Sequence, residues 1–538
     1  MKRLILLIYL AVQCASLHAA ERPTIAVLPF GEAKDRNQVK YLGLATASTL
    51  VEKLRRVPPV RILPISSIIQ ELRTAGIDPY EVSWAPAVAT EPLGQWLDAD
   101  ILIIGAIGQT RDRKIADVIL QVSQNAPSAK SAQIWLAARA VDIHTGETLR
   151  RAYVEGRHDN LFDLQHDLLT HIGDLLGIRD HLSLDVVQRP PTQNIKAYTQ
   201  VAEAERLIMD LDQIEDKKRE DQLKKVAKRL KWALDREPEF ALAHTWQGAL
   251  LALQNQSHAS AEAFETAAKL DPHLSAPYYG LADLSLQQQD MVAATTALGQ
   301  MLEITPWDDE AHRLQGKIQE ILGNQTQALA AYERALDLYP QQHATHYAVG
   351  KIFLVQQEHK KAVDALQKAV DVVPGNLVYQ IALADAHLAM KNPNRAKEVL
   401  ESIASFAQND PEFIFVRGKH ALQTDRLTDA IADFKEALTV LNERADVHAA
   451  LGTAYTVQSR FSDAIGAFID AQSHGAALAD IAIPFGTALE AQGQMAEAAD
   501  LYQQALNQAP SRSELRLRLV KHLITNKKHD EAIETLKT

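Results

Sequence analysis

Apolar residues recur at helical spacing from about Asn194 to the end of the chain, in pairs of segments separated by polar breaks such as Gly323-Asn324-Gln325. The pattern repeats every 34 residues, and three columns keep this interval. The columns are a proline (Pro238, Pro272, Pro306, Pro340, Pro374 and Pro510), a small residue (Gly248, Ala282, Gly316, Gly350, Ala384, Gly418, Gly452 and Gly486) and an alanine (Ala294, Ala328, Ala362, Ala396, Ala430, Ala464, Ala498 and Ala532). A lone helix pair cannot bury its apolar face, so the pattern predicts stacked helix pairs with one continuous core, an all-α solenoid.

Each column has a physical reason. Small residues are expected where one helix lies close to the next, because a larger side chain would separate the two axes. Proline ends each period because it cannot continue the preceding helix and suits the first turn of the next. In the first period we expect helices over 197–209 and 222–234, joined by a polar loop over 210–221.

The repeats resemble the tetratricopeptide repeat, whose pattern is Trp-x2-Leu-Gly-x2-Tyr, then Ala-x3-Phe, then Pro. One period reads His448-x2-Leu451-Gly452-x2-Tyr455 and then Ala464-x3-Phe468. The departures from the pattern are histidine in the tryptophan column (His244, His312, His346 and His448) and Gln408 and Asn442 in the proline column. The resemblance covers roughly the last two-thirds of the chain and implies a fold and a protein-binding groove, but no particular ligand.

The residues before the repeats have a different pattern. Short apolar runs predict strands at 24–30, 60–63, 101–105, 118–122, 134–141 and 148–154, and helical spacing predicts helices at 39–54, from 65 to 72, at 93–97 and at 161–176. Strands that first alternate with helices and then follow one another directly indicate an α/β domain with a mixed sheet. Gly146 is expected to supply the positive backbone angle of a turn at 144–147.

This region resembles the TolB amino-terminal domain. The resemblance lies in the opening Ile25-Ala26-Val27-Leu28-Pro29-Phe30, in the run 99–107 with Asp100 before an apolar strand, and in the hairpin 140–147 with Thr145-Gly146. It implies contacts between proteins of a bacterial envelope. We therefore expect a TolB-like α/β domain at 21–183, a linker at 184–193 containing Pro190-Pro191, and an array at 194–538 of about nine helix pairs plus a partial last repeat.

The first twenty residues have the order of a secretory signal peptide. Lys2 and Arg3 precede an apolar run over 4–12, which is too short to span a bilayer, and small residues follow up to Ala19-Ala20. Cleavage there would make the mature protein exported and, we expect, periplasmic. Two alternatives stay open: an uncleaved anchor, and lipidation of Cys14, the single cysteine of the chain.

Charge and motifs argue against several classes of function. The net charge of −12 and the sequence pI near 5.9 give no overall nucleic-acid footprint. Phosphate-binding glycine loops, a Gly-x-Ser-x-Gly elbow and a His-Glu-x2-His motif are absent from the sequence. Of the 19 histidines, His166 and His171 are five residues apart on a predicted helix, and those in the tryptophan column lie whole periods apart, so packing explains them better than a metal ion. We predict no catalytic residue, cofactor or metal.

The densest basic segment, 217–231, has two interpretations. One is a patch that contacts an anionic membrane or a nucleic acid. The other, which we favour because no aromatic residues interleave, is the solvated face of the second helix of the first repeat, with Glu220 and Asp221 favouring its amino end.

The last candidate site is a peptide-binding groove along the repeats. In tetratricopeptide arrays the first helix of each pair lines the concave face, and in this register the face would carry Tyr279, Asp283, Arg313, Lys317, Tyr347, Lys351, Asp385, Phe415 and Lys419. These are residues that an extended-peptide groove would use, although ordinary exposed helix positions would look the same. Aspartates at 283 and 385 stand where a clamp for a carboxyl terminus would need amides.

We therefore expect a non-catalytic exported scaffold that binds other proteins through this groove and through the α/β domain. Two other classes stay open: an accessory subunit of an envelope enzyme or polysaccharide-handling complex, and a hydrolase or transferase with its site in the α/β domain. The end of the solenoid could also pair with a second copy of the chain.

Overall fold

The structure is a computed structural model that describes residues 23–32, 41–57, 60–74, 76–81, 93, 97, 99–109, 116, 133–174, 178 and 189–537. The chain forms two compact units, Met1–Pro340 and Gln341–Thr538, and each is described by itself. The expected signal peptide and the expected strand at 118–122 lie outside the described residues, as does much of the expected linker.

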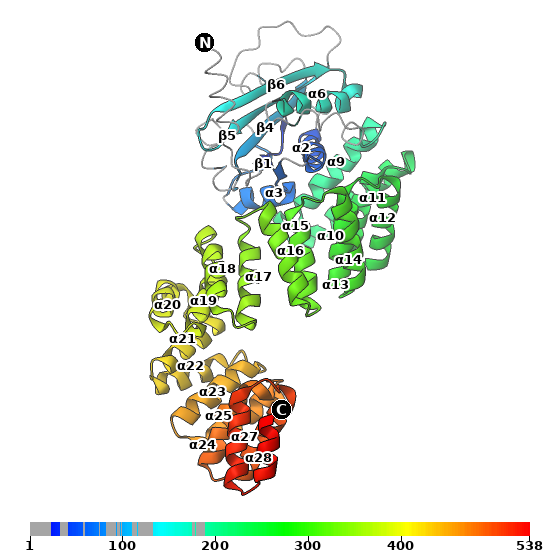
Figure 1. The fold of residues 1–538 in the computed structure, drawn as a ribbon. Helices are drawn as coiled ribbons and strands as arrows, with labels where there is room; N and C mark the ends of the chain where they lie inside the picture. The colour runs from blue at the N-terminus through cyan, green and yellow to red at the C-terminus, as the bar shows by residue number, and fades with distance from the viewer. Residues whose placement is uncertain are drawn as a thin grey trace, which may run out of the picture. The chain divides into compact units, whose positions relative to one another are not determined.

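Unit 1 begins with a mixed sheet (Figure 1). Its strands are β1 Thr24–Val27, β2 Gly31–Glu32, β3 Arg61–Ile62, β4 Ile101–Gln109, β5 Ile134–Asp142 and β6 Thr148–Gly156. The order is β3-β1-β4-β5-β6, with β2 also on β4. β1 pairs in parallel with β3 and β4, whereas β4, β5 and β6 are antiparallel. The predicted α/β class with a mixed sheet is confirmed.

Side chains on this sheet alternate between two buried faces, as the period of a strand requires. Ile25 and Val27 lie in one core cluster, and Ala26 and Leu28 in another on the opposite face. Three helices pack on the sheet region: α2 Leu42–Arg55, α3 Ile65–Thr74 and α6 Leu161–Gly173, which follows the short turn η4 His158–Asn160. Gly146 has φ +71°, the left-handed angle predicted for the turn between β5 and β6.

Four helix pairs complete unit 1. They are α9 Ile195–Met209 with α10 Asp216–Arg236, α11 Ala241–Leu253 with α12 Ser257–Leu270, α13 Ser275–Gln287 with α14 Met291–Ile304, and α15 Asp309–Ile321 with α16 Gln325–Leu338. A short turn, η5 Leu211–Gln213, links α9 to α10. The predicted loop over 210–221 is therefore wrong in its second half, because α10 starts six residues before the position expected. The early turns of α10 need no apolar residues, since charge pairs one turn apart support them, such as Lys224 Nζ to Glu220 Oε1 at 2.8 Å.

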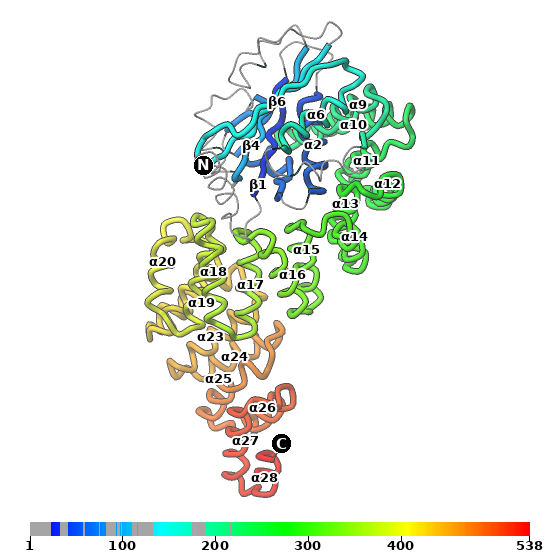
Figure 2. Tube along the Cα trace, turned by 45° about the horizontal axis from the view of Figure 1, so that its top comes forward, coloured from blue at the N-terminus to red at the C-terminus, as the bar shows by residue number. Residues whose placement is uncertain are grey.

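Unit 2 continues the repeats, each pair stacking on the next (Figure 2). The pairs are α17 His343–Val355 with α18 His359–Val372, α19 Leu377–Ala389 with α20 Pro393–Ala407, α21 Pro411–Gln423 with α22 Leu427–Ala437, α23 Ala445–Val457 with α24 Phe461–Ser473, α25 Leu478–Ala491 with α26 Met495–Gln508, and α27 Ser513–Thr525 with the nine-residue α28 His529–Lys537. The predicted all-α solenoid is confirmed.

The small-residue column makes room for a large side chain from the second helix of the same pair. A Cβ added at Gly316 would lie 2.5 Å from the ring of Tyr332, and one added at Gly452 would lie 2.8 Å from the ring of Phe468. The large residue is always sixteen positions later: Gly248–Phe264, Ala282–Leu298, Gly316–Tyr332, Gly350–Leu366, Ala384–Leu400, Gly418–Phe434, Gly452–Phe468 and Gly486–Tyr502. Both alanines of this column face a leucine, and every aromatic partner lies opposite a glycine, so a full ring occurs only where the first helix has no Cβ.

A further column, not noticed in the sequence, sets the turn within each pair. The second residue after the first helix takes a positive φ between 58° and 80° in nine consecutive periods: Asn255, Gln289, Gly323, Gln357, Lys391, Asp425, Ser459, Gly493 and Lys527. This left-handed residue lets the chain reverse and lets its neighbours bond back to the last turn, as Asn324 N does to Gln319 O at 2.8 Å.

Candidate functional site

The α/β domain lies against the first helices of the repeats in unit 1. At the start of α13, the backbone N–H and the hydroxyl of Ser275 donate to the Glu52 carboxylate of α2 at 3.2 Å and 3.1 Å. The Arg61 guanidinium of β3 donates to both oxygens of Asp309, the first residue of α15, at 3.2 Å and 3.3 Å. The Trp307 indole N–H donates to the carbonyl of Arg55 at 2.8 Å. Two elements of the sheet domain thus hold two successive repeats.

A second set of contacts joins α3 to the end of α9. The Arg73 guanidinium donates to the Met209 carbonyl at 2.5 Å and also bonds the Asp210 carboxylate. Tyr80 donates its hydroxyl to the same carboxylate at 2.8 Å, and the Arg206 guanidinium lies 3.8 Å from the Tyr80 ring centre. These contacts are charge-assisted and partly buried, so they fix the orientation of the α/β domain on the first repeat.

Polar groups are buried where α2 meets α9. The Tyr198 hydroxyl donates to the Ala45 carbonyl at 2.8 Å and lies 2.7 Å from the Thr49 hydroxyl. The Ser48 hydroxyl donates to the carboxylate of Glu205, a residue that is 3% exposed. Burial raises the pKa of the Glu205 carboxyl to about 7. A carboxyl in such a place favours its protonated form because a charge there would lose its hydration. Residues of α2, α6, α9 and α10 belong to one apolar cluster, so the first repeat shares its core with the sheet domain.

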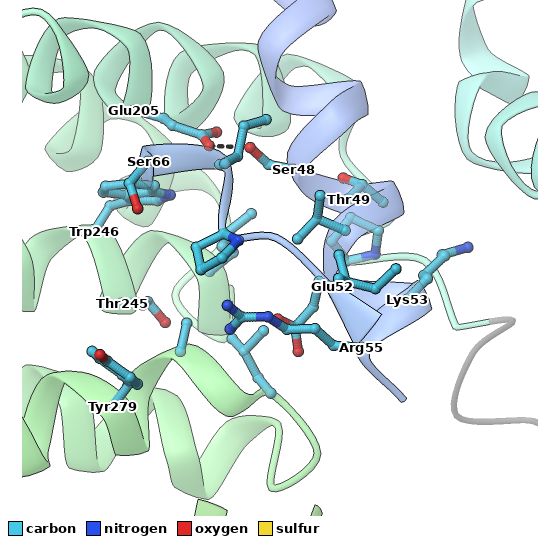
Figure 3. A pocket seen from close by; sticks show the side chains of 18 of the residues that line it. Ser48, Thr49, Glu52, Lys53, Arg55, Ser66, Glu205, Thr245, Trp246 and Tyr279 are labelled. Atoms are coloured by element: carbon cyan, nitrogen blue, oxygen red, sulfur yellow. Dashed lines mark hydrogen bonds between the residues drawn. The ribbon is translucent and has the colours of Figure 1, made fainter. Parts of the chain in front are cut away.

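Between these contacts lies a cavity of about 740 Å³ (Figure 3). Helix α2 and the segment from β3 into α3 form one side, and α9, α11, α13 and the start of α15 form the other. Its walls are mainly apolar. Arg55 extends from α2 toward Thr245 and Tyr279 of the facing helices (Figure 3).

The predicted groove residues of unit 1 fall into two environments. Tyr279 of α13 lines this cavity, and burial together with the charges of Glu310 and Asp308 raises the pKa of its hydroxyl to about 12. Arg313 of α15 donates to the Glu310 carboxylate at 2.7 Å. Asp283 and Lys317 are exposed, and Asp283 accepts a bond from the Gln287 amide at 2.8 Å. Tyr279 therefore faces the chain's own α/β domain.

The predicted residues of unit 2 form two small clusters. In the first, the ring of Tyr347 of α17 lies 5.0 Å from that of Tyr379 of α19, and Lys351 is exposed with its ammonium 5.8 Å from the Tyr347 ring centre. In the second, Lys419 of α21 pairs with Asp385 of α19. Phe415, also on α21, is only 5% exposed and packs at 5.9 Å from Phe434, so it belongs to the core.

Residues that the sequence analysis missed complete these clusters. Tyr379 went unnoticed because its column holds core residues such as Phe413, and it is itself 7% exposed. Arg444, before α23, donates to Asp446 at 2.8 Å and to Glu412 of the preceding repeat at 2.5 Å. Arg512 pairs in the same way with Asp480, again 32 residues earlier. The 32-residue spacing between an acid and an arginine occurs twice, so the sequence alone could have indicated these ion pairs between neighbouring repeats.

The histidines of the tryptophan column bond the loop before their own helix. The Nε2 atoms of His244, His312 and His448 lie 2.8, 3.1 and 2.8 Å from the carbonyl oxygen six residues earlier. A histidine N–H that donates to this carbonyl stabilises the turn that the proline column occupies. Within the part of the chain that the structure describes, no group of three or more His, Cys, Asp or Glu side chains is arranged to hold a metal ion.

The basic segment lies on α10, where most of its side chains are exposed. Val226 and Leu230 are its residues in the core, at 0% and 1% exposure. No described helix combines the length and the apolar character needed to cross a membrane.

Comparison with protein families identifies the repeats. One tetratricopeptide-repeat family model matches residues 353–414 and 489–538, and a second matches 227–275, 313–376 and 415–477. These segments cover helix pairs of both units. The helical part of the chain is therefore a solenoid of tetratricopeptide repeats, as its sequence predicts. No curated protein matches the chain.

Solved structures give similar folds at low identity. A tetratricopeptide repeat protein from Parabacteroides merdae has 18% identity and a TM-score of 0.34, over 46% of this chain and 97% of that one. YrrB, described as a tetratricopeptide protein with an unusual peptide-binding site, has 20% identity and a TM-score of 0.28, over 37% of this chain and 100% of that one. PilW, a type IV pilus biogenesis factor, has 16% identity and a TM-score of 0.34, over 39% and 98%.

Proposed function

We propose that the protein is a non-catalytic exported adaptor of a bacterial cell envelope, which binds other proteins through the first helices of its repeats and through its TolB-like α/β domain. The observation that carries this proposal is the tetratricopeptide solenoid itself, a class of fold that mediates contacts between proteins. A long array contributes many small contacts, and their sum sets the affinity for a partner.

Within unit 2 the aromatic and basic cluster on α17 and α19 supports a binding role. Tyr347 is half-buried, with one side against Tyr379, and Lys351 is exposed beside it. An aromatic ring held by its neighbour, next to an exposed cation, suits an extended peptide because the ring loses little freedom on binding. Asp385 and Lys419 on the next helices would add polar contacts along the same groove.

The test is capture of partners by the variant Tyr347→Ala with Lys351→Ala. We expect partner affinity to fall by about 10- to 100-fold, as for the loss of an aromatic anchor and a charge, while the melting temperature falls by no more than a few degrees. Partners are captured by crosslinking in intact cells that produce the protein and identified by mass spectrometry.

A matched control removes an aromatic ring and a lysine from the second helix of a pair. Phe406 is 81% exposed on α20, and Lys397 lies on the same helix. Phe406→Ala with Lys397→Ala should leave capture unchanged. Equal capture by the groove variant and the wild type would remove the groove assignment, and an enzyme among the captured proteins would favour an accessory subunit.

Export is the second part of the proposal. It is supported by the order of basic, apolar and small residues over 1–20, which lie outside the described residues. Intact-mass measurement of the protein recovered from the periplasm should show loss of about the first twenty residues. Recovery of the full-length chain from the cytoplasm would contradict it.

A further inference from the structure

The cavity in unit 1 is unusual for a contact between two parts of one chain. Such contacts normally exclude voids, because interiors pack as densely as organic crystals. At about 740 Å³ this one is instead in the range of small-molecule sites, roughly 300–1,000 Å³. The indole of Trp246 and the side chains of Ala249 and Ala276 are among its mainly apolar walls. A molecule with an apolar body would fill it and replace water there.

The charges around the cavity are mostly paired with one another. Asp309 is held by Arg61, and Glu52 by Arg56 at 3.2 Å. Glu310 is held by Arg313. These carboxylates are therefore already balanced and do not call for a cationic ligand.

Two further acids line the cavity, of which Glu205 is buried and Asp308 is half-buried. Glu205 accepts the Ser48 hydroxyl, and Asp308 accepts the backbone N–H of Ala311 at 2.9 Å. Burial raises the pKa of both carboxyls, so each keeps its proton to a higher pH than a free carboxyl does.

Lys53, Arg55 and Arg189 also line the cavity, and the side chain of Arg55 faces its interior (Figure 3). Among the described residues the Arg55 guanidinium makes no hydrogen bond or ion pair, although its backbone carbonyl accepts from Trp307. The side chain extends across the cavity toward Thr245 and Tyr279 (Figure 3). It is close enough to Tyr279 and Asp308 for its charge to oppose the rise that burial causes in the pKa of both groups. A guanidinium with free donors beside apolar walls is a site for a planar anion.

We propose that this cavity binds a small apolar molecule carrying one carboxylate, with the carboxylate on Arg55 and the apolar body against Trp246 and the helices α11 and α13. The ligand would contact α2 and the repeats together, so binding would stabilise the docking of the α/β domain on the array. This site is separate from the peptide groove of unit 2, and its occupancy can be measured without any protein partner.

The test uses the full chain and two probes of the same length, dodecanoate and dodecanol, in calorimetric titrations below their aggregation concentrations. We expect dodecanoate to bind with a 1:1 stoichiometry at least tenfold more tightly than dodecanol. Arg55→Met keeps an unbranched apolar side chain in place of the aliphatic part of arginine and removes the charge, so it should remove the tenfold preference while dodecanol binding stays unchanged. Arg334→Met, at an exposed arginine of α16, is the matched control and should bind as the wild type does.

A second variant tests the location. Ala249→Phe places a ring in the cavity from α11 and should abolish binding of both probes, and its circular dichroism spectrum and melting temperature show whether the fold is retained. If Ala249→Phe fails to fold, hydrogen exchange of the wild type decides, and dodecanoate should then slow exchange in α2, α11 and α13. The proposal is overturned if dodecanoate does not bind, if Arg55→Met keeps the tenfold preference, or if protection by dodecanoate appears elsewhere.

Discussion

Gly452 offers a test of how each repeat is held together. It lies within α23, and an added Cβ would be 2.8 Å from Cε1 and 2.9 Å from Cδ1 of the Phe468 ring. The ring is fully buried at 0% exposure, so it has nowhere to move without shifting a helix. Gly466, one helix later in the same repeat, has no atom within 4 Å of its added Cβ. Both glycines lie inside helices, so the pair separates packing from helix propensity.

The two substitutions should change stability in opposite directions. Alanine in place of a helix-interior glycine contributes about 1 kcal/mol, which Gly466→Ala should gain in full. Gly452→Ala gains the same amount but overpacks the contact with Phe468, which costs about 1–3 kcal/mol and occasionally more. We expect a net loss of about 1 kcal/mol or more for Gly452→Ala.

The assay is hydrogen exchange of α23 and α24 in the full chain, because a solenoid opens locally and a single melting temperature would average over many repeats. Exchange through local opening should become at least about fivefold faster for Gly452→Ala and about fivefold slower for Gly466→Ala. The cost should shrink in a Phe468→Leu background, since alanine already faces leucine at Ala282–Leu298 and Ala384–Leu400. If Gly452→Ala slows exchange as Gly466→Ala does, the volume argument fails.

Two predictions follow from the buried carboxyl and the turn column. The folded chain keeps the proton of Glu205 up to about pH 7, whereas a free carboxyl has a pKa of 4.5. The contribution of this group to the free energy of unfolding, roughly 3 kcal/mol, is therefore complete below pH 4.5 and is lost as the pH rises to 7. Urea unfolding from about pH 4.5 to 7.5 should show this loss in the wild type and not in Glu205→Gln, and parallel pH profiles of the two would contradict the prediction. Gly323 has φ +78°, so Gly323→Ala should destabilise the α15–α16 pair by about 1 kcal/mol. Gly299→Ala, inside α14 with an open Cβ position, should stabilise its own pair instead, and hydrogen exchange of the two pairs measures both.

The sequence predicted the solenoid because its determinants recur. Two columns identify each helix pair independently of the other pairs. One is a glycine or alanine every 34 residues, and the other is an alanine column that the structure buries almost completely. The mixed sheet was likewise predictable from local apolar runs. The start of α10 was missed because its first turns are held by charge pairs and carry no apolar period.

The cavity and the docking of the α/β domain could not be predicted in this way. Arg61 and Asp309 are 248 residues apart, and a single charge pair at that distance leaves no periodic signal. The groove residues depended on helix register alone, which places Phe415 in the same column as Tyr347 although Phe415 is buried and Tyr347 is half-buried. A small rotation of a helix decides between those outcomes, and the sequence does not specify it.

The sixteen-residue spacing between each small residue and its large partner bears on how such a chain can grow. Both members fall inside a single 34-residue segment, so tandem duplication of that segment would copy both residues of the contact together and would require no compensating change in the neighbouring repeats. Genetic exchange that cut between the two members could instead join an alanine to a tyrosine and create a clash. We expect inherited breakpoints in related arrays to avoid those sixteen positions.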